Sequence, residues 1–316
     1  MSLAPIILFV YNRPEHTRKT LEALADNFLA DVSILYVYAD GPKKDADESM
    51  VESLNNTRRI IKERQWCKEV VIIESEINKG LADSIVEGVT SVINKHGKAI
   101  ILEDDIVTTS GFLKYMNDAL NLYEEDKEVM HISGYLPTTM GQEKLSETFF
   151  LRYMNCWGWA TWKDRWSHLS TDSESLYQTA ISLPDIAELD FKGELNPHIL
   201  EQLDNNRKGI MKTWAVKWYL SIFIQKGLCL YPHKSLVNNI GFDGSGENCG
   251  VYIHGAKVFS NEMRVVKTPI IESKQALKYM KDFFKYGSAP TYKTILQTDY
   301  PSLHQFLYRI YKLFKR

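Results

Sequence analysis

Apolar runs of strand length alternate with amphipathic stretches through the first third of the chain. The runs are continuous, which is typical of parallel strands that are buried on both faces. They cover residues 6–10, 33–38, 70–73 and 98–102, and the amphipathic stretches between them cover 15–28, 45–65 and 81–95. This pattern predicts an α/β fold with a mainly parallel, twisted sheet and helices on both of its faces.

Polar side chains follow each of the four predicted strands. They are Asn12 and Arg13, then Asp40, then Asn78 and Lys79, and finally Glu103, Asp104 and Asp105. Because such sheets bind ligands outside the carboxyl ends of their strands, we expect these side chains to share one crevice. Arginine suits bidentate contact with phosphate, and aspartate accepts hydrogen bonds from a nucleobase or a ribose. Taken singly, each has a structural alternative: a surface ion pair for Arg13, a turn with Gly41 for Asp40, and an Asx-turn for Asn78.

Three consecutive carboxylates, Glu103 to Asp105, directly follow the fourth predicted strand. Like charges at this density favour a bound cation, and oxygen ligands suit Mg²⁺ or Mn²⁺, which keep positions open for water and phosphate oxygens. The alternative is an acidic turn that caps a helix beginning near Gly111. The position after a buried strand favours the metal, with a substrate diphosphate as its further ligand.

Glycine is absent from the chain before Gly41. Dinucleotide-binding and P-loop sites need a glycine-rich turn directly after the first strand, so that the backbone can approach phosphate. The sequence therefore excludes both motifs at that place, and it disfavours sugar nucleotidyltransferases for the same reason. A diphosphate bridged by a metal and held by carboxylates and one arginine remains.

The segment 11–21 (YNRPEHTRKTL), Asp40-Gly41 and Glu103-Asp104-Asp105 together resemble the nucleotide-sugar half of GT-A glycosyltransferases. The similarity covers about residues 4–165 and is strongest to the N-acetylglucosaminyltransferase I type, with a looser similarity to family 2 enzymes. The resemblance implies a UDP-sugar donor, with Mn²⁺ or Mg²⁺ bound directly by Asp105. It also implies roles in donor binding, which fall to Glu103 and Asp104 (ribose and sugar), Asp40 (uracil), Arg13 (phosphate) and Asn78 and Lys79 (further base contacts).

Four tryptophans lie within ten residues, at positions 157, 159, 162 and 166. The last three have the spacing of one helix face, which predicts a core stripe for Trp162 and Trp166. Trp157 and Trp159 lie beside Gly158 at the start of this predicted helix, where aromatic faces next to a small residue suit a sugar ring. The resemblance likewise places Gly158 and Trp159 beside the donor sugar.

The base that takes the acceptor's proton is harder to place. The resembled family carries an aspartate between tryptophans like Trp214 and Trp218, but this chain has only Ala, Val and Lys between them. An inverting transfer needs a carboxylate for this step while the metal stabilises the leaving diphosphate. The glycine-containing segment 238–250 offers Asp243, which we predict as the base, and Glu247 as the second choice. The alternative is an ordinary surface turn.

Charge and cysteine content narrow the class of protein. The chain has 38 basic and 40 acidic residues, a net charge of −2, which argues against a nucleic-acid partner. Its four cysteines include no CxxC pair, which argues against a zinc site or a disulfide framework. We see no secretory signal and no apolar run of eighteen residues, so a reducing cytoplasm is the simplest expectation.

The segment 303–316 is aromatic and basic, with apolar residues at helical spacing. Such a segment can lie at the inner face of a membrane, where a lipid-linked glycan acceptor would be found. The alternative is an apolar face docked on the domain or on a second subunit.

These observations predict a metal-dependent GT-A-type glycosyltransferase that moves a hexosyl or N-acetylhexosaminyl group to a glycan hydroxyl with inversion, as in polysaccharide biosynthesis. The predicted organisation is a nucleotide-sugar-binding half (1–135), an acceptor-binding and catalytic half (136–270) and a C-terminal helical tail (271–316). Two alternatives stay open: a non-catalytic sugar-nucleotide or glycan-binding protein on the same fold, and a phosphate-cleaving enzyme with two metals at residues 103–105.

Overall fold

One large sheet organises the molecule. The computed structural model describes residues 3–139, 141–191, 199–246, 263–287, 302–305 and 307, and its main sheet has eight strands in the order β3-β2-β1-β4-β8-β6-β9-β7. Only β8 and β7 run against the other six strands. The sheet is therefore mainly parallel, as the apolar runs predict.

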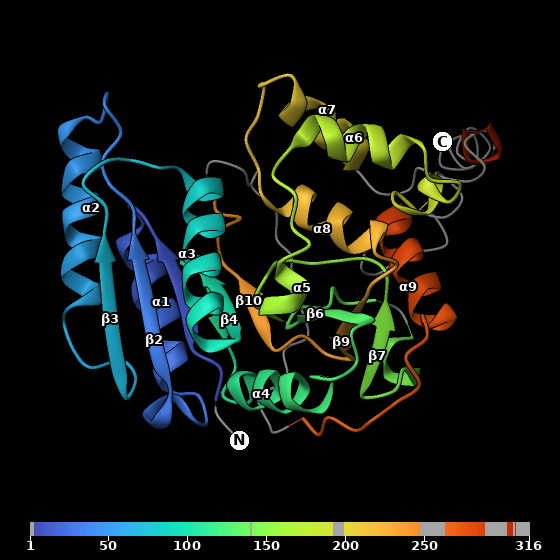
Figure 1. Cartoon of the computed structure of the whole chain (residues 1–316), viewed down its shortest axis with the longest axis horizontal. Helices are drawn as coiled ribbons and strands as arrows, with labels where there is room; N and C mark the ends of the chain where they lie inside the picture. Colours follow the sequence, from blue (N-terminus) through green and yellow to red (C-terminus); the bar gives the residue numbers. More distant parts are fainter. Residues whose placement is uncertain are drawn as a thin grey trace, which may run out of the picture.

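The first four strands form a parallel unit with their connecting helices on both sides (Figure 1). Along β1 the side chains alternate between two cores, with Ile6 and Leu8 in one and Ile7 and Phe9 in the other. This double burial explains the continuous apolar runs. The elements are β1 (Ile6–Val10), α1 (Pro14–Ala25), β2 (Ile34–Ala39), α2 (Glu48–Ile61), β3 (Glu69–Glu74), α3 (Leu81–His96) and β4 (Lys98–Glu103).

The remaining strands extend the same sheet, so both predicted halves share it. Buried side chains of α1, α2 and α4 join one core, and those of α3, α8 and α9 join the other. The elements are α4 (Phe112–Leu122), β6 (Val129–Ser133), β7 (Thr148–Leu151), β8 (Trp159–Trp162), α5 (Lys163–Trp166), α6 (Ser173–Ile181), α7 (Ile199–Arg207), α8 (Ala215–Ile224), β9 (Leu228–Pro232) and α9 (Lys274–Tyr286). Three short 3₁₀ helices cover Ala30–Val32, Gln142–Lys144 and Ile186–Glu188.

A separate two-stranded ladder lies beside the acidic triplet. Here β5 (Ile106–Thr108) pairs antiparallel with β10 (Val237–Asn239). The ladder brings the loop after β10 against Asp105, which is distant from it in sequence. It is the element that joins the two halves of the predicted site.

The predicted tryptophan helix is wrong. Trp159 and Trp162 lie on the central strand β8, and Trp166 ends the four-residue helix α5. Because side chains alternate across a strand, Trp159 and Trp162 enter opposite cores instead of sharing one face. The i, i+3 spacing fits a helix face equally well, but the position of β8 between β4 and β6 decides the structure.

Trp159 belongs to an aromatic core with a buried histidine. Its ring stacks on Trp214 at 5.2 Å and on His131 at 5.2 Å. His131 Nδ1 accepts from Trp218 Nε1, and Nε2 lies 2.9 Å from the Asn155 carbonyl oxygen, so the neutral ring with its proton on Nε2 satisfies both contacts. Burial lowers the pKa of His131 to about 3.

This histidine should make the protein less stable in acid. The unfolded chain binds a proton near the ordinary histidine pKa of 6.5, whereas the folded chain does not until about pH 3. The free energy of unfolding is therefore expected to fall below pH 6.5, with a loss of about 2 kcal/mol from this residue by pH 5. Urea denaturation at several pH values between 7 and 4.5 gives the free energy of unfolding as a function of pH. This free energy should fall less steeply with decreasing pH for His131→Gln than for wild type. The exposed His168→Gln is the control, and equal slopes for all three proteins would contradict the assignment.

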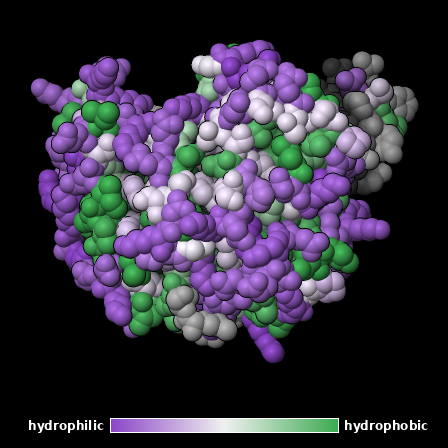
Figure 2. Space-filling view, viewed as in Figure 1, coloured by the Kyte–Doolittle hydropathy of each residue, from purple (hydrophilic) through white to green (hydrophobic). Residues whose placement is uncertain are grey.

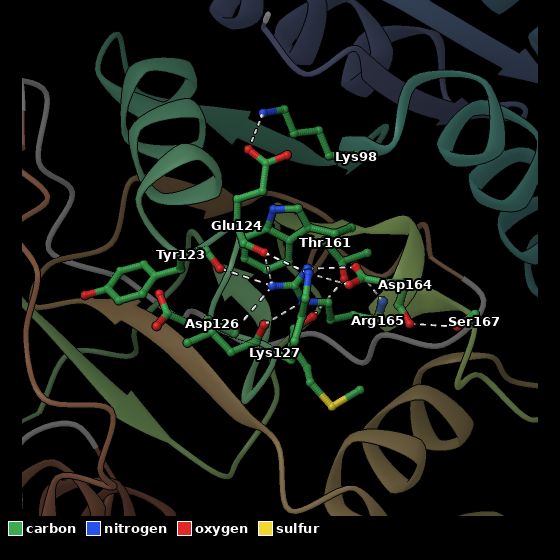
Figure 3. A network of polar contacts seen from close by, with 12 residues as sticks. Lys98, Tyr123, Glu124, Asp126, Lys127, Thr161, Asp164, Arg165 and Ser167 are labelled. Carbon is green, nitrogen blue, oxygen red and sulfur yellow. Dashed lines mark hydrogen bonds and ion pairs between the residues drawn. The ribbon is translucent and has the colours of Figure 1, made fainter. Parts of the chain in front are cut away.

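A second buried polar residue, Arg165, holds the turn after α4 (Figure 3). Its side chain is 3% exposed and lies over the Trp162 ring. The guanidinium donates to carbonyl oxygens and to one carboxylate: Tyr123 (3.1 Å), Glu124 (2.6 Å), Asp126 (3.2 Å), Val129 (3.3 Å) and Asp164 Oδ1 (2.7 Å). These bonds tie the segment between α4 and β6 to the start of α5.

The face of the molecule seen in Figure 2 is largely polar, with apolar side chains gathered in smaller areas. Among the described residues, no helix combines the length and the apolar character needed to cross a membrane. The segment 303–316, for which we predict a membrane or subunit contact, lies mostly outside the described residues.

Candidate active site

A pocket opens at the carboxyl ends of β1, β2 and β4, beside the start of α3. Parallel strands deliver their last residues to one edge of the sheet, so residues far apart in sequence meet here. The predicted residues that line this pocket are Asn12, Arg13, Asp40, Asn78, Glu103, Asp104 and Asp105. Their predicted convergence is confirmed, and their individual binding roles stay predictions.

Arg13 pairs with two members of the acidic triplet. Its Nη2 donates to Asp104 Oδ1 and, at 2.9 Å, to Asp105 Oδ2, while Nε donates to Asp104 Oδ2 at 3.4 Å. The Asp104 and Asp105 side chains are only 6% and 8% exposed. The Thr20 hydroxyl also donates to the Asp104 backbone oxygen at 2.8 Å, which ties this turn to α1. The predicted surface alternative for Arg13 is therefore wrong, because its ion pairs are largely buried.

Burial and crowding change the acidity of these groups. Burial, followed by repulsion from Asp105 and Asp104, raises the pKa of Glu103 to about 8. Burial also raises the pKa of Asp104 to about 6, although Arg13 counteracts part of this effect. For Arg13, burial lowers the pKa, but attraction to Asp104 and Asp105 outweighs it and leaves the pKa above its ordinary value. The raised pKa values show that one arginine does not fully offset the burial and mutual repulsion of these carboxylates.

Arg13 has one nitrogen without a partner. Its Nη1 is buried and makes no hydrogen bond to any of the described residues. A Cβ added at Gly241 would lie 3.1 Å from this nitrogen and 2.2 Å from Asp105 Oδ2, so only glycine leaves room there. The backbone of this loop is fixed by Ile240, whose N–H donates to the Asp105 carbonyl oxygen at 2.9 Å. The loop after β10 therefore lies directly against the acidic turn.

Asp40 holds the start of α3 in place. Its Oδ1 accepts from the N–H groups of Gly41 and Lys79, both at 2.9 Å, and its Oδ2 accepts from Gly80 N–H at 2.9 Å and Asn78 Nδ2 at 3.1 Å. The bond to Gly41 is the one that the predicted turn alternative requires, and the other three bonds link the carboxylate to the loop before α3. Its direct reading of uracil would have to compete with them, so we assign Asp40 a positioning role.

Two predicted base contacts differ in position. Asn78 lines the pocket, but the side chain of Lys79 turns away from it and pairs with Glu87 at 2.7 Å. Lys43 lies at the pocket instead, three residues after Asp40, and the sequence pattern did not point to it. The strand-end rule that indicates Asp40 would also indicate Lys43 if it were extended through the turn. Tyr38 and Ser84 also line the pocket and were not predicted. Tyr38 lies within β2, before the strand end, and Ser84 lies inside α3.

Gly158 and Trp159 are not among the residues that line the pocket. Trp159 is fully buried, so its predicted contact with the donor sugar is wrong in this structure. Gly158 has a φ of 64°, accepts from Gly134 N–H at 2.7 Å and would press a Cβ onto Val237 of β10. Its requirement for glycine thus comes from the close approach of the backbone to β10.

The predicted base Asp243 lies at the border of the pocket. Its Oδ2 is 3.1 Å from His16 Nε2, and Oδ1 accepts from both the hydroxyl and the N–H of Ser245, which itself lines the pocket. Hydrogen bonds from Ser245, with attraction to His16, lower the pKa of Asp243 to about 2. This value makes it a weak base in the observed arrangement. Glu247, the second choice, lies outside the described residues.

The donor chemistry of the acidic turn fits Mg²⁺ or Mn²⁺. It presents hard carboxylate oxygens, and those of Asp104 and Asp105 already hold a cationic group, the Arg13 guanidinium. Within the described residues, however, no group of three or more His, Cys, Asp or Glu side chains is arranged to hold a metal. A divalent ion would therefore depend on ligands from water and from a substrate.

No protein-family model and no curated protein matches the chain. Solved structures match it only distantly. Residues 1–349 of TarS from S. aureus align at 14% identity and a TM-score of 0.37, over 51% of this chain and 47% of that one. The galactosyltransferase LgtC, in complex with donor and acceptor sugar analogs, aligns at 9% identity and a TM-score of 0.38, over 72% of both chains. Mouse xyloside xylosyltransferase 1 aligns at 10% identity and a TM-score of 0.35, over 71% of this chain and 82% of that one.

This chain spans about half the length of the TarS chain that it matches. Scores this low carry no argument on activity, so the site has to be interpreted from its own geometry. The mainly parallel sheet, the helices on both faces and the pocket at the strand ends agree with the sequence prediction. The chain has an α/β fold with a mainly parallel sheet between helices on both faces, and the GT-A type is what the sequence resemblance implies for it.

Proposed function

We propose that this protein is a glycosyltransferase that transfers a sugar from a nucleotide-diphosphate donor, a UDP-sugar, to a hydroxyl group of a glycan. The observation that carries the proposal is the strand-end pocket in which Arg13 meets Asp104 and Asp105. A buried cation next to excess carboxylate suits a ligand that brings both negative phosphate and a positive metal ion.

Each part of the pocket then has a task. Arg13 binds the diphosphate, and Asn12 and Asn78 contact the nucleoside from the ends of β1 and the loop before α3. Asp40 fixes that loop through its four hydrogen bonds. Asp105 would hold Mn²⁺ or Mg²⁺, with Glu103 and Asp104 beside it. When bound, this ion would supply Lewis-acid stabilisation of the charge that develops on the leaving diphosphate.

In this proposal Asp243 takes the acceptor's proton, because its hydrogen-bond partner Ser245 lines the pocket. A transfer assisted by such a base would be an inverting one. Its low pKa requires that the Ser245 bonds loosen before the carboxylate can hold a proton. The alternative function is a sugar-nucleotide or glycan-binding protein without turnover. It is favoured by Ala215, Val216 and Lys217, which occupy the place where the resembled enzymes carry an aspartate.

Calorimetric titration of the full chain with UDP, GDP and CMP, each with MnCl₂ and with EDTA, tests the proposal. Mn²⁺-dependent binding of UDP is expected, followed by release of UDP from one member of a UDP-sugar panel in the presence of a glycan acceptor. Turnover should fall strongly in Asp243→Asn. Affinity without any turnover would favour the binding protein, and the absence of binding to all three nucleotides would refute the proposal.

A further inference from the structure

Arg13 occupies the position between the two carboxylates that a metal ion would have to share. Its Nη2 reaches Asp104 Oδ1 and Asp105 Oδ2 at once, and the latter distance is 2.9 Å. The guanidinium keeps its charge at every accessible pH, so it cannot leave these carboxylates by losing a proton. A divalent cation that arrives alone therefore meets a fixed positive charge and an Asp105 oxygen that is already in use.

The protein also offers a lone cation few other ligands. Within the described residues, no set of three or more His, Cys, Asp or Glu side chains forms a metal site. Mg²⁺ and similar ions are commonly held by one or two carboxylates together with substrate phosphates. The missing ligands and the competing arginine act in the same direction, since both weaken binding of the metal by itself.

The other side of Arg13 is prepared for an anion. Nη1 is buried and lacks a hydrogen-bond acceptor in the part of the chain that the structure describes, and leaving a buried donor unpaired is costly. Arg13 lines the pocket, so a phosphate bound there would lie beside its guanidinium. A phosphate oxygen at Nη1 would satisfy the donor and would draw the guanidinium's charge away from Asp105.

We infer that Arg13 couples the two ligands of the site: it withholds Asp105 from a free divalent cation and releases that carboxylate when a diphosphate binds its unpaired nitrogen. The inference rests on the proposed function, because it assumes that the diphosphate of a nucleotide occupies this pocket. By linkage, UDP and Mn²⁺ must then strengthen each other's binding by the same factor.

The test measures three affinities by calorimetry on the full chain: MnCl₂ alone, UDP alone in EDTA, and UDP with saturating MnCl₂. Wild type and Arg13→Gln are compared, with Arg18→Gln as a matched control, because Arg18 lies on the adjoining helix α1 in an exposed pair with Glu63. Arg13→Gln should bind Mn²⁺ alone about tenfold more tightly and UDP alone about tenfold more weakly. The factor by which Mn²⁺ strengthens UDP should fall, and the remainder should come from direct contact between the metal and the phosphates. Arg18→Gln should match wild type in all three affinities.

The inference predicts tighter binding of Mn²⁺ but weaker binding of UDP by Arg13→Gln, whereas a general loss of structure would weaken both. If Arg13→Gln binds Mn²⁺ more weakly than or as weakly as wild type, Arg13 does not compete with the metal and the inference is overturned. Arg13→Lys serves if the glutamine variant fails to fold. Its ammonium ends one bond short of the position of Nη2 and should hold Asp105 less well, so the Mn²⁺ affinity should exceed that of wild type, and an affinity equal to wild type would again refute competition. Tighter Mn²⁺ binding by Arg13→Gln without UDP binding by any variant would support the competition but refute the nucleotide, and so the coupling and the proposed function.

Discussion

Asparagine in place of Asp105 is expected to lower the affinity for UDP in the presence of Mn²⁺ at least a hundredfold, about 2.8 kcal/mol. The amide keeps nearly the same shape and an oxygen that can accept from Arg13 Nη2, but it loses the charge that a divalent ion requires. Since the described residues offer no alternative set of metal ligands, another side chain cannot compensate. UDP binding in EDTA should stay within about threefold of wild type, because that mode depends on Arg13.

The control for this change is Asp118→Asn. Asp118 lies on α4 in a partly exposed pair with Lys114, away from the pocket. Calorimetric titrations of the two variants and wild type, with and without MnCl₂, give the comparison. If Asp105→Asn retains the full Mn²⁺ effect, the metal does not use Asp105, and the acidic turn has a structural role instead.

Alanine in place of Arg165 is expected to lower the free energy of unfolding by about 3–5 kcal/mol. The change removes a buried guanidinium and takes one donor from each of the carbonyl oxygens of Tyr123, Glu124 and Asp126 (Figure 3). It also removes the cation above the Trp162 ring. Arg165→Lys should lose most of this stability as well, because a single ammonium cannot reproduce the fork of donors.

Urea denaturation followed by tryptophan fluorescence measures this loss. Arg59→Ala is the control, since Arg59 is exposed and donates to Asn56 on its own helix, and it should cost less than about 1 kcal/mol. Equal losses for the two alanine variants would show that the Arg165 network contributes little to stability.

The sequence predicted the first half of the molecule well. Strands β1 to β4 and helices α1 to α3 follow from continuous apolar runs and helical periodicity, and each boundary is within four residues of its predicted place. The convergence of Arg13, Asp40 and residues 103–105 followed from one rule, that parallel strands end at the same edge. Local pattern was sufficient there because each strand is a continuous apolar run and each helix has apolar residues at helical spacing.

The second half shows where local pattern fails. The spacing of Trp159, Trp162 and Trp166 is compatible with a helix, yet the unpaired edges of β4 and β6 are joined by a strand at this place. Burial on both faces then removes Trp159 from the pocket. Pairing between distant strands, rather than the spacing of apolar residues, decided this segment.

By itself, the sequence determined the α/β class, the strand-end position of the site and the acidic and basic groups in it. The tertiary structure alone decided that Arg13 lies between Asp104 and Asp105, that the carboxylate of Asp40 is saturated by the loop before α3, and that Gly241 fits against Asp105. The physical reason is the range of the interactions. Periodicity and turn preference act within a few residues, whereas ion pairs and close backbone contacts join distant residues, such as Asp105 and Gly241, which are 136 positions apart (241 − 105).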